Sequence, residues 1–184
     1  MKPIIFLIPI VAILISIILY IFLLKKADDK KIFKRYVLIM AVISFILNEV
    51  WELIQMPLYS SAYYNVEHIV FCTLGALADT IMVLLLYFSF AFIYKNIFWI
   101  WQTNWFKIFV VMLTGAVGAV LSEKRHLLLG SWAYDQSMPI VPVVNVGLSP
   151  MLQFFLLPVI IYYLSYFINS KFYNQTILHH TNHH

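Results

Sequence analysis

The amino-acid sequence predicts an all-α, polytopic membrane protein, a bundle of about five transmembrane helices. Of its 184 residues, 63% are hydrophobic and 11% are charged, whereas globular proteins average about 45–50% apolar and about 25% charged residues. A soluble domain of this length could not bury so much apolar surface. The single cysteine, Cys72, also excludes a disulfide framework within the chain.

Five segments are long and apolar enough to cross a bilayer, which requires about 20 predominantly apolar residues. In chain order we expect spans at 3–24, 36–59, 68–94, 107–122 and 149–169, forming one domain over 1–170 that is followed by a polar tail over 171–184. The first segment contains no charge and no small-residue cleavage site follows it, so it is predicted to be an uncleaved anchor rather than a signal peptide.

The connections and helix ends carry their own signals. The stretch 96–106 contains three tryptophans, which are typical of the headgroup region. The fourth helix could continue beyond its span to Leu129. Ser149 followed by Pro150 predicts the N-cap and first position of the fifth helix. The long connection 122–148 is too apolar for disorder and is expected to be a lid over the outer end of the bundle.

Lysine and arginine are distributed unevenly between the two ends of the spans. Nine of the twelve lie in or beside the first and third connections and the tail, and three lie at the opposite end. Because short cytoplasmic loops are enriched in Lys and Arg, we expect the N-terminus outside and the C-terminus inside.

Most acidic residues fall at the predicted outer end. They are Glu49, Glu52, Glu67, Asp79, Glu123 and Asp135. An ionisable residue inside a span is costly and indicates function. Asn48, Glu52 and Gln55 are spaced i, i+4, i+7, and His68, Cys72 and Asp79 are spaced i, i+4, i+11, so each set forms one helical stripe. A short connection makes these helices antiparallel neighbours, with their stripes facing each other.

These residue types predict acid–base chemistry. The candidate acids and bases are Glu52, Asp79, Glu123 and His68, and the candidates for substrate binding are Asn48, Glu49, Gln55, Arg125, Trp132, Tyr134 and Gln153. Each also has a structural interpretation. The carboxyls could only join helices, the aromatic residues could anchor the chain at the interface, and Arg125 could extend towards the headgroups.

No metal site is predicted, and the sequence identifies no cofactor. Glu123 and His126 form the single ExxH pair, whereas diiron bundles require two. His68, His126 and Glu123 or Glu52 are ligand types that zinc accepts, but their spacing is generic. The spans hold no lysine for a retinal Schiff base, no arginine series and no HExxH, GxSxG or P-loop motif. Nothing indicates nucleic-acid binding.

Two blocks of sequence carry a resemblance to known families. The segments 132–158, WAYDQSMPIVPVVNVGLSPMLQFFLLP, and 48–59, NEVWELIQMPLY, resemble blocks of a family of small bacterial multi-pass membrane proteins. The chain is also similar to the membrane-embedded carotenoid cyclases and hydratases, which have intramembrane carboxyls and a Trp/Tyr-containing outer loop. That resemblance implies an acid able to protonate a polyene, a role that Glu52 or Glu123 could fill.

Three functions are consistent with the sequence. The first is an intramembrane enzyme of a cell membrane, the bacterial inner membrane, acting on a lipid or isoprenoid-like substrate from the outer leaflet. The second is a non-catalytic lipid-binding or assembly subunit whose polar layer is structural. The third is a small proton-coupled carrier. Membrane lipids are the expected partners, and the oligomeric state stays open.

Overall fold

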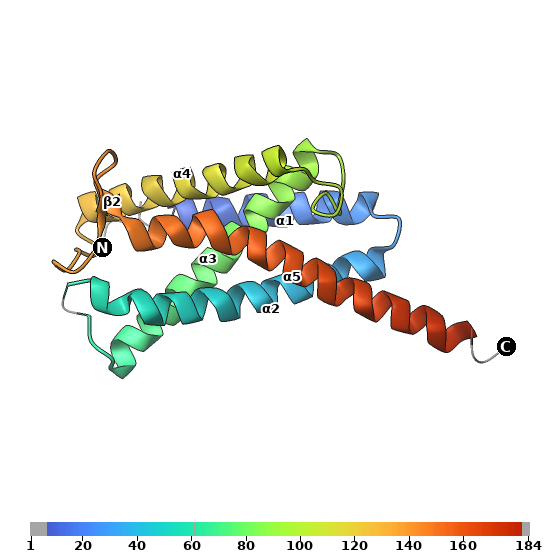
Figure 1. Cartoon of the computed structure of the whole chain (residues 1–184), viewed down its shortest axis with the longest axis horizontal. Helices are drawn as coiled ribbons and strands as arrows, with labels where there is room; N and C mark the ends of the chain where they lie inside the picture. The colour runs from blue at the N-terminus through green and yellow to red at the C-terminus, as the bar shows by residue number, and fades with distance from the viewer. Residues whose placement is uncertain (1–6, 61, 182–184) are drawn as a thin grey trace. The chain divides into compact units, whose positions relative to one another are not determined.

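The computed structural model describes residues 7–60 and 62–181, and it confirms the all-α helical class. The helices are α1 (Leu7–Lys26), α2 (Lys30–Gln55), α3 (Val66–Ile93), α4 (Trp105–Leu129) and α5 (Leu148–Thr181) (Figure 1). A 3-10 turn, Met56–Leu58, follows α2, and two short strands, β1 (Ile140–Val141) and β2 (Val146–Gly147), pair antiparallel before α5. All five helices are long and apolar enough to span a bilayer, so this is an integral, multi-pass membrane protein.

Caps explain where several helices begin and end. Asp29 Oδ1 accepts from the backbone N–H groups of Lys31 and Ile32 at 2.8 and 2.9 Å, so α2 begins within the basic connection, before the predicted span. Asn104 caps α4 by accepting from the Lys107 N–H at 2.9 Å. Gly130 ends this helix with φ of 66°, a left-handed conformation that favours glycine.

The fifth helix differs from the sequence-based expectation at both ends. It begins at Leu148, so Ser149 lies in the first turn rather than at the N-cap. The Ser149 hydroxyl instead donates to the side chain of Gln55 at 2.8 Å. At its other end, α5 continues past Asn169 to Thr181, through most of the segment that was expected to be a tail. At the first end, Ser149 therefore bonds to Gln55 of α2 and does not cap its own helix.

The chain divides into two compact units, each of which is described separately. The first contains Met1–Ile43, Ile81–Thr103 and Ile160–His184, and the second contains Ser44–Thr80 and Asn104–Val159. Helices α2, α3 and α5 each contribute one part to each unit. The candidate acids fall in the second unit.

Aromatic side chains form the core of the first unit. Tyr36, Tyr87 and Tyr162 are fully buried, and Trp99 is 2% exposed. The rings of Tyr87 and Tyr162 lie 5.0 Å apart, and Tyr162 donates to the Val83 carbonyl at 2.7 Å. Because buried phenols need hydrogen-bond partners, backbone carbonyls satisfy them here. Trp99, one of the three tryptophans of the 96–106 stretch, packs its ring into this core, 5.8 Å from the ring of Tyr162.

In the second unit, α4 and α5 approach closely at a glycine. A Cβ atom added to Gly115 would lie 2.1 Å from the carbonyl oxygen of Phe154, whereas one added to Gly118 would meet nothing within 4 Å. Ala119, one turn further along, is 5% exposed. Small residues at this step allow the two backbones to pack together.

Candidate functional site

Gln153 of α5 is the centre of a polar cluster in the second unit. Its side chain is 2% exposed. The Nε2 atom lies 2.9 Å from Asp79 Oδ2, 3.0 Å from Asn48 Oδ1 and 3.4 Å from Glu52 Oε1. An amide nitrogen carries only two hydrogens, so the two shorter contacts are the principal bonds and Glu52 competes for them. One amide thus brings two carboxyls from α2 and α3 to the same point.

A second amide holds Glu52 in place. Gln55 Nε2 donates to Glu52 Oε1 at 2.8 Å and to Gln153 Oε1 at 3.2 Å. Its oxygen accepts from Ser149 Oγ at 2.8 Å, and Ser149 Oγ in turn accepts from Trp51 Nε1 at 3.3 Å. Each member of this chain has a defined donor and acceptor role, so the orientation of the Gln55 amide follows from its partners.

The amide residues of the cluster are more deeply buried than its two acidic residues. Asn48, Gln55 and Gln153, which we call the amide framework, are 1%, 2% and 2% exposed. Glu52 and Asp79 are half-buried as whole residues. The Asn48 amide is itself fixed, because Nδ2 donates to the Ser44 carbonyl at 2.8 Å. A buried framework therefore holds two acidic residues that are themselves only half-buried.

Glu123 of α4 is held by the connection that follows α4. Its side chain is 6% exposed, and its Oε2 accepts from Trp132 Nε1 at 3.3 Å and from the Tyr134 hydroxyl. The connection is fastened to the segment after α2, since Ser60 N donates to the Ala133 carbonyl at 2.9 Å. Trp132 and Tyr134 thus both donate to the Glu123 carboxylate. Their rings also lie 6.2 and 5.6 Å from the ring of Tyr59.

Tyr59 is a residue of this site that the sequence reasoning did not select. Its ring lies 5.6 Å from that of Tyr134. Burial raises the pKa of the Tyr59 phenol, and the charges of Glu123 and Glu52 raise it further. The sequence feature that could have selected Tyr59 is its position at the end of the 48–59 block, which also contains Glu52. The hydroxyl therefore stays protonated beside the carboxyls.

Alkaline pH provides a test of this placement. Tyr59 has a folded-state pKa above the ordinary value of 10.0, so its contribution to stability is complete below that value and is lost as the pH rises towards the folded-state pKa. We expect wild-type protein to lose stability above about pH 10 and Tyr59→Phe to lose less. Thermal unfolding across this range measures the difference. Tyr63→Phe, at a side chain that is 70% exposed, should match wild type, and equal losses in all three proteins would contradict the placement.

The remaining candidates lie outside the cluster around Gln153. His68 Nδ1 contacts Asn65 Oδ1 at 2.9 Å, and His126 stacks on Trp132 with ring centroids 4.2 Å apart. Glu49 Oε1 accepts from Thr73 Oγ1 at 2.9 Å. Arg125 is half-buried and has partners of its own. Among the described residues, no three His, Cys, Asp or Glu side chains are grouped closely enough to hold a metal ion.

Glu49 also contains an unsatisfied atom. Its Oε2 is buried and has no hydrogen-bond partner within the part of the chain that the structure describes. Such an atom is costly unless a proton or a water satisfies it. Glu49 lies next to Asn48 in α2, but its side-chain hydrogen bond is to Thr73 and not to a residue of the Gln153 cluster.

Comparisons of the chain with protein-family models, with curated proteins and with solved structures found no match. The function is therefore inferred from the geometry of the polar cluster and from its position within helices that can span a membrane.

Proposed function

We propose that this integral membrane protein is an enzyme that performs acid–base chemistry on a lipid or isoprenoid-like apolar substrate. Glu52 and Asp79 are the proposed acid and base, and the substrate enters from the outer leaflet of a cell membrane. The cluster lies within three helices that can span a bilayer, where an apolar substrate dissolves and where ionisable groups are otherwise avoided.

The contrast in burial between amides and carboxyls carries this proposal. A carboxyl whose only role is to join helices gains most when it is fully enclosed by donors. Here the residues of the amide framework are enclosed, with exposed fractions of 1–2%, while the residues Glu52 and Asp79 are only half-buried. Preorganised side chains that fix two carboxyls beside each other are what proton transfer requires.

Two carboxyls at one point can move protons without any other reagent. One carboxyl gives its proton to a carbon–carbon double bond, which forms a C–H bond and leaves a carbocation. The other carboxylate removes a proton from a neighbouring carbon, and the electrons of that C–H bond form a new double bond. The substrate keeps its atoms, so the reaction class is isomerisation. It becomes cyclisation where a second double bond of the substrate attacks the carbocation and forms a C–C bond before the proton is removed. Transfer of one proton between the two neighbouring carboxyls then restores their starting states. The aromatic rings of Trp132, Tyr134 and Tyr59 suit the stabilisation of such a cation.

Mass spectrometry of an organic extract tests the proposal. The full-length protein is purified gently in detergent, extracted, and compared with an extract of the host membrane. We expect one apolar lipid or isoprenoid at close to one molecule per protein. Bulk phospholipid alone, in the proportions of the host membrane, would contradict the proposal.

One observation favours a second candidate, a non-catalytic assembly or lipid-binding subunit. Gln153 and its partners connect α2, α3 and α5 through side-chain hydrogen bonds, and polar contacts of this kind can determine helix packing in membranes. Under this alternative, Glu52→Ala lowers expression and thermal stability and removes no activity.

A further inference from the structure

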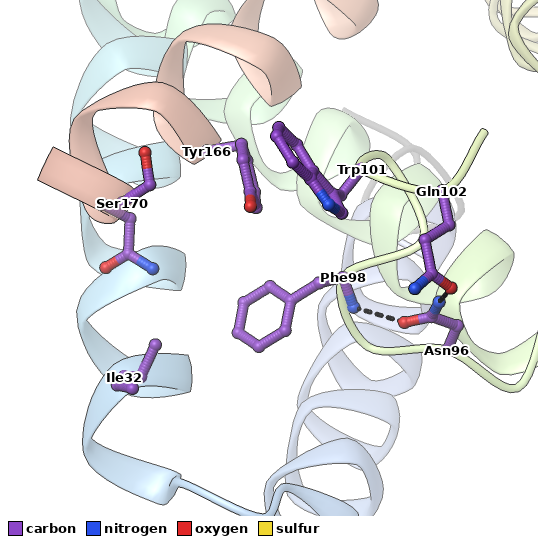
Figure 2. Close-up of a pocket in the computed structure, with 8 residues that line it drawn as sticks. Ile32, Asn96, Phe98, Trp101, Gln102, Tyr166 and Ser170 are labelled. Carbon is purple, nitrogen blue, oxygen red and sulfur yellow. Dashed lines mark hydrogen bonds between the residues drawn. The ribbon is translucent and has the colours of Figure 1, made fainter. Parts of the chain in front are cut away.

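The first unit contains a pocket that the proposed chemistry does not use. Its volume is about 320 Å³, within the lower range of ligand sites. The side chains around it are aromatic or polar with one isoleucine, and Figure 2 shows them converging from three segments: Ile32, Asn96, Phe98, Trp101, Gln102, Tyr166, Asn169 and Ser170.

The residues that line the pocket lie near the ends of candidate spans, where lipid headgroups are expected. Ile32 follows the start of the second span, Lys30–Leu58, and Ser170 precedes the end of the fifth, Leu148–Lys171. The other segment, 96–102, connects the third and fourth spans. All of the lining residues are therefore close to a span end, and these ends carry most of the lysine and arginine of the chain.

A buried amide residue lines this pocket. Asn169 is 4% exposed. Arg35 Nε donates to Asn169 Oδ1 at 2.9 Å, which determines the orientation of the amide group. The opposite atom, Nδ2, donates to no residue that the structure describes. Asn169 Nδ2 thus has no acceptor among the described residues and is available to a ligand.

Three further donors around the pocket also lack an acceptor. Gln102 accepts from Asn96 Nδ2 at 3.1 Å through its oxygen, which leaves its own Nε2 hydrogens free. The ring of Trp101 stacks on that of Tyr166 with centroids 4.7 Å apart. Neither the Trp101 indole N–H nor the Tyr166 hydroxyl bonds to a residue in the described part of the chain. The pocket therefore offers several donors to a ligand rich in acceptors.

The surrounding charge favours an anion. Residues 25–35 contain six basic and two acidic side chains. Arg35, among them, contacts the pocket residue Asn169 directly through its guanidinium group. At headgroup depth the abundant acceptor-rich anion is phosphate, and basic segments beside a span attract it.

We propose that this pocket binds a phosphate group, carried by an anionic lipid headgroup or by a soluble phosphate ester. Trp101, Gln102, Asn169 and Tyr166 donate to its oxygens, and Arg35 provides positive charge behind Asn169. This site is independent of the carboxyl cluster in the second unit.

The test compares three probes on the purified full-length protein in detergent. Phosphatidylglycerol, the matching diacylglycerol without phosphate, and glycerol 1-phosphate are titrated, and bound ligand is counted by native mass spectrometry. Gln102→Glu keeps the oxygen that Asn96 needs and replaces the donor with a negative charge at an exposed position. Gln136→Glu makes the same change at an exposed position in the connection after α4.

We expect wild type and Gln136→Glu to bind phosphatidylglycerol and not diacylglycerol. Gln102→Glu should weaken that binding by about tenfold, the typical effect of losing one hydrogen bond to a charged group. Trp101→Phe, which keeps the ring stack and removes only the N–H, should weaken binding in the same direction.

The soluble probe separates the two sources of phosphate. Displacement of phosphatidylglycerol by glycerol 1-phosphate would show that the pocket recognises phosphate free of the bilayer. Failure of glycerol 1-phosphate to displace a Gln102-dependent lipid would assign the site to a lipid headgroup. Equal binding of phosphatidylglycerol and diacylglycerol, or unchanged phosphatidylglycerol binding in Gln102→Glu, would overturn the proposal.

Discussion

Replacement of Glu52 with glutamine is expected to slow turnover by about 10²- to 10⁴-fold, the contribution of a positioned general acid or base. Glutamine has nearly the same size and still offers an oxygen to Gln55 Nε2, which donates to Glu52 Oε1 at 2.8 Å. It has no carboxyl proton to transfer. The measurement is the conversion of the extracted substrate by purified protein in lipid nanodiscs, followed by mass spectrometry.

A matched variant separates chemistry from loss of charge. Glu67 is exposed in the first turn of α3. Glu67→Gln therefore removes a carboxyl near the same α2–α3 connection but outside the cluster, and this variant should retain full turnover. Thermal unfolding of both variants should stay close to wild type. If Glu52→Gln turns over as fast as Glu67→Gln, Glu52 is not the acid. If it unfolds at a much lower temperature and the wild type converts no substrate, the cluster is structural.

The substitution Gly115→Ala is expected to produce the largest loss of stability. The added Cβ would lie 2.1 Å from the Phe154 carbonyl oxygen, and because that oxygen belongs to the backbone of α5, no rotamer change can relieve the overlap. Overpacking typically costs about 1–3 kcal/mol, and a forced separation of two helices places this variant at the upper end. Thermal unfolding in detergent measures the loss.

Gly118→Ala is the internal control for this effect. Both substitutions gain up to about 1 kcal/mol from the higher helix propensity of alanine. A Cβ at Gly118 meets nothing within 4 Å, so this variant should be as stable as wild type or slightly more stable. Their difference isolates the contact with Phe154. Equal unfolding temperatures for the two variants would show that α4 and α5 do not approach at Gly115.

Local sequence signals predicted the helical segments well. Each span is a run of apolar residues, and hydropathy depends on composition rather than on contacts between segments. The predicted helix ends were less accurate where side-chain hydrogen bonds determine the first residue of a helix. The Asp29 cap starts α2 earlier than hydropathy predicts, whereas the Ser149 hydroxyl, which matches an N-cap pattern, bonds to Gln55 on another helix.

Helical spacing in the sequence also predicted part of the candidate site. The i, i+4, i+7 spacing of Asn48, Glu52 and Gln55 selected three residues that the structure places in one hydrogen-bonded cluster. His68 shares a stripe with Asp79 by spacing, yet its ring nitrogen bonds to the neighbouring Asn65. Spacing identifies the residues on one face of a helix, but it does not identify their partners.

The amino-acid sequence alone establishes a multi-pass helical membrane protein with ionisable groups inside its spans, because length, hydropathy and helical period are local properties of the chain. Tertiary packing alone establishes that Gln153 joins Asn48 to Asp79, that Tyr59 lies beside Tyr134, and that Asn169 turns its amide nitrogen away from Arg35. These contacts join residues on different segments. Their geometry depends on how the segments approach one another, which no local pattern encodes.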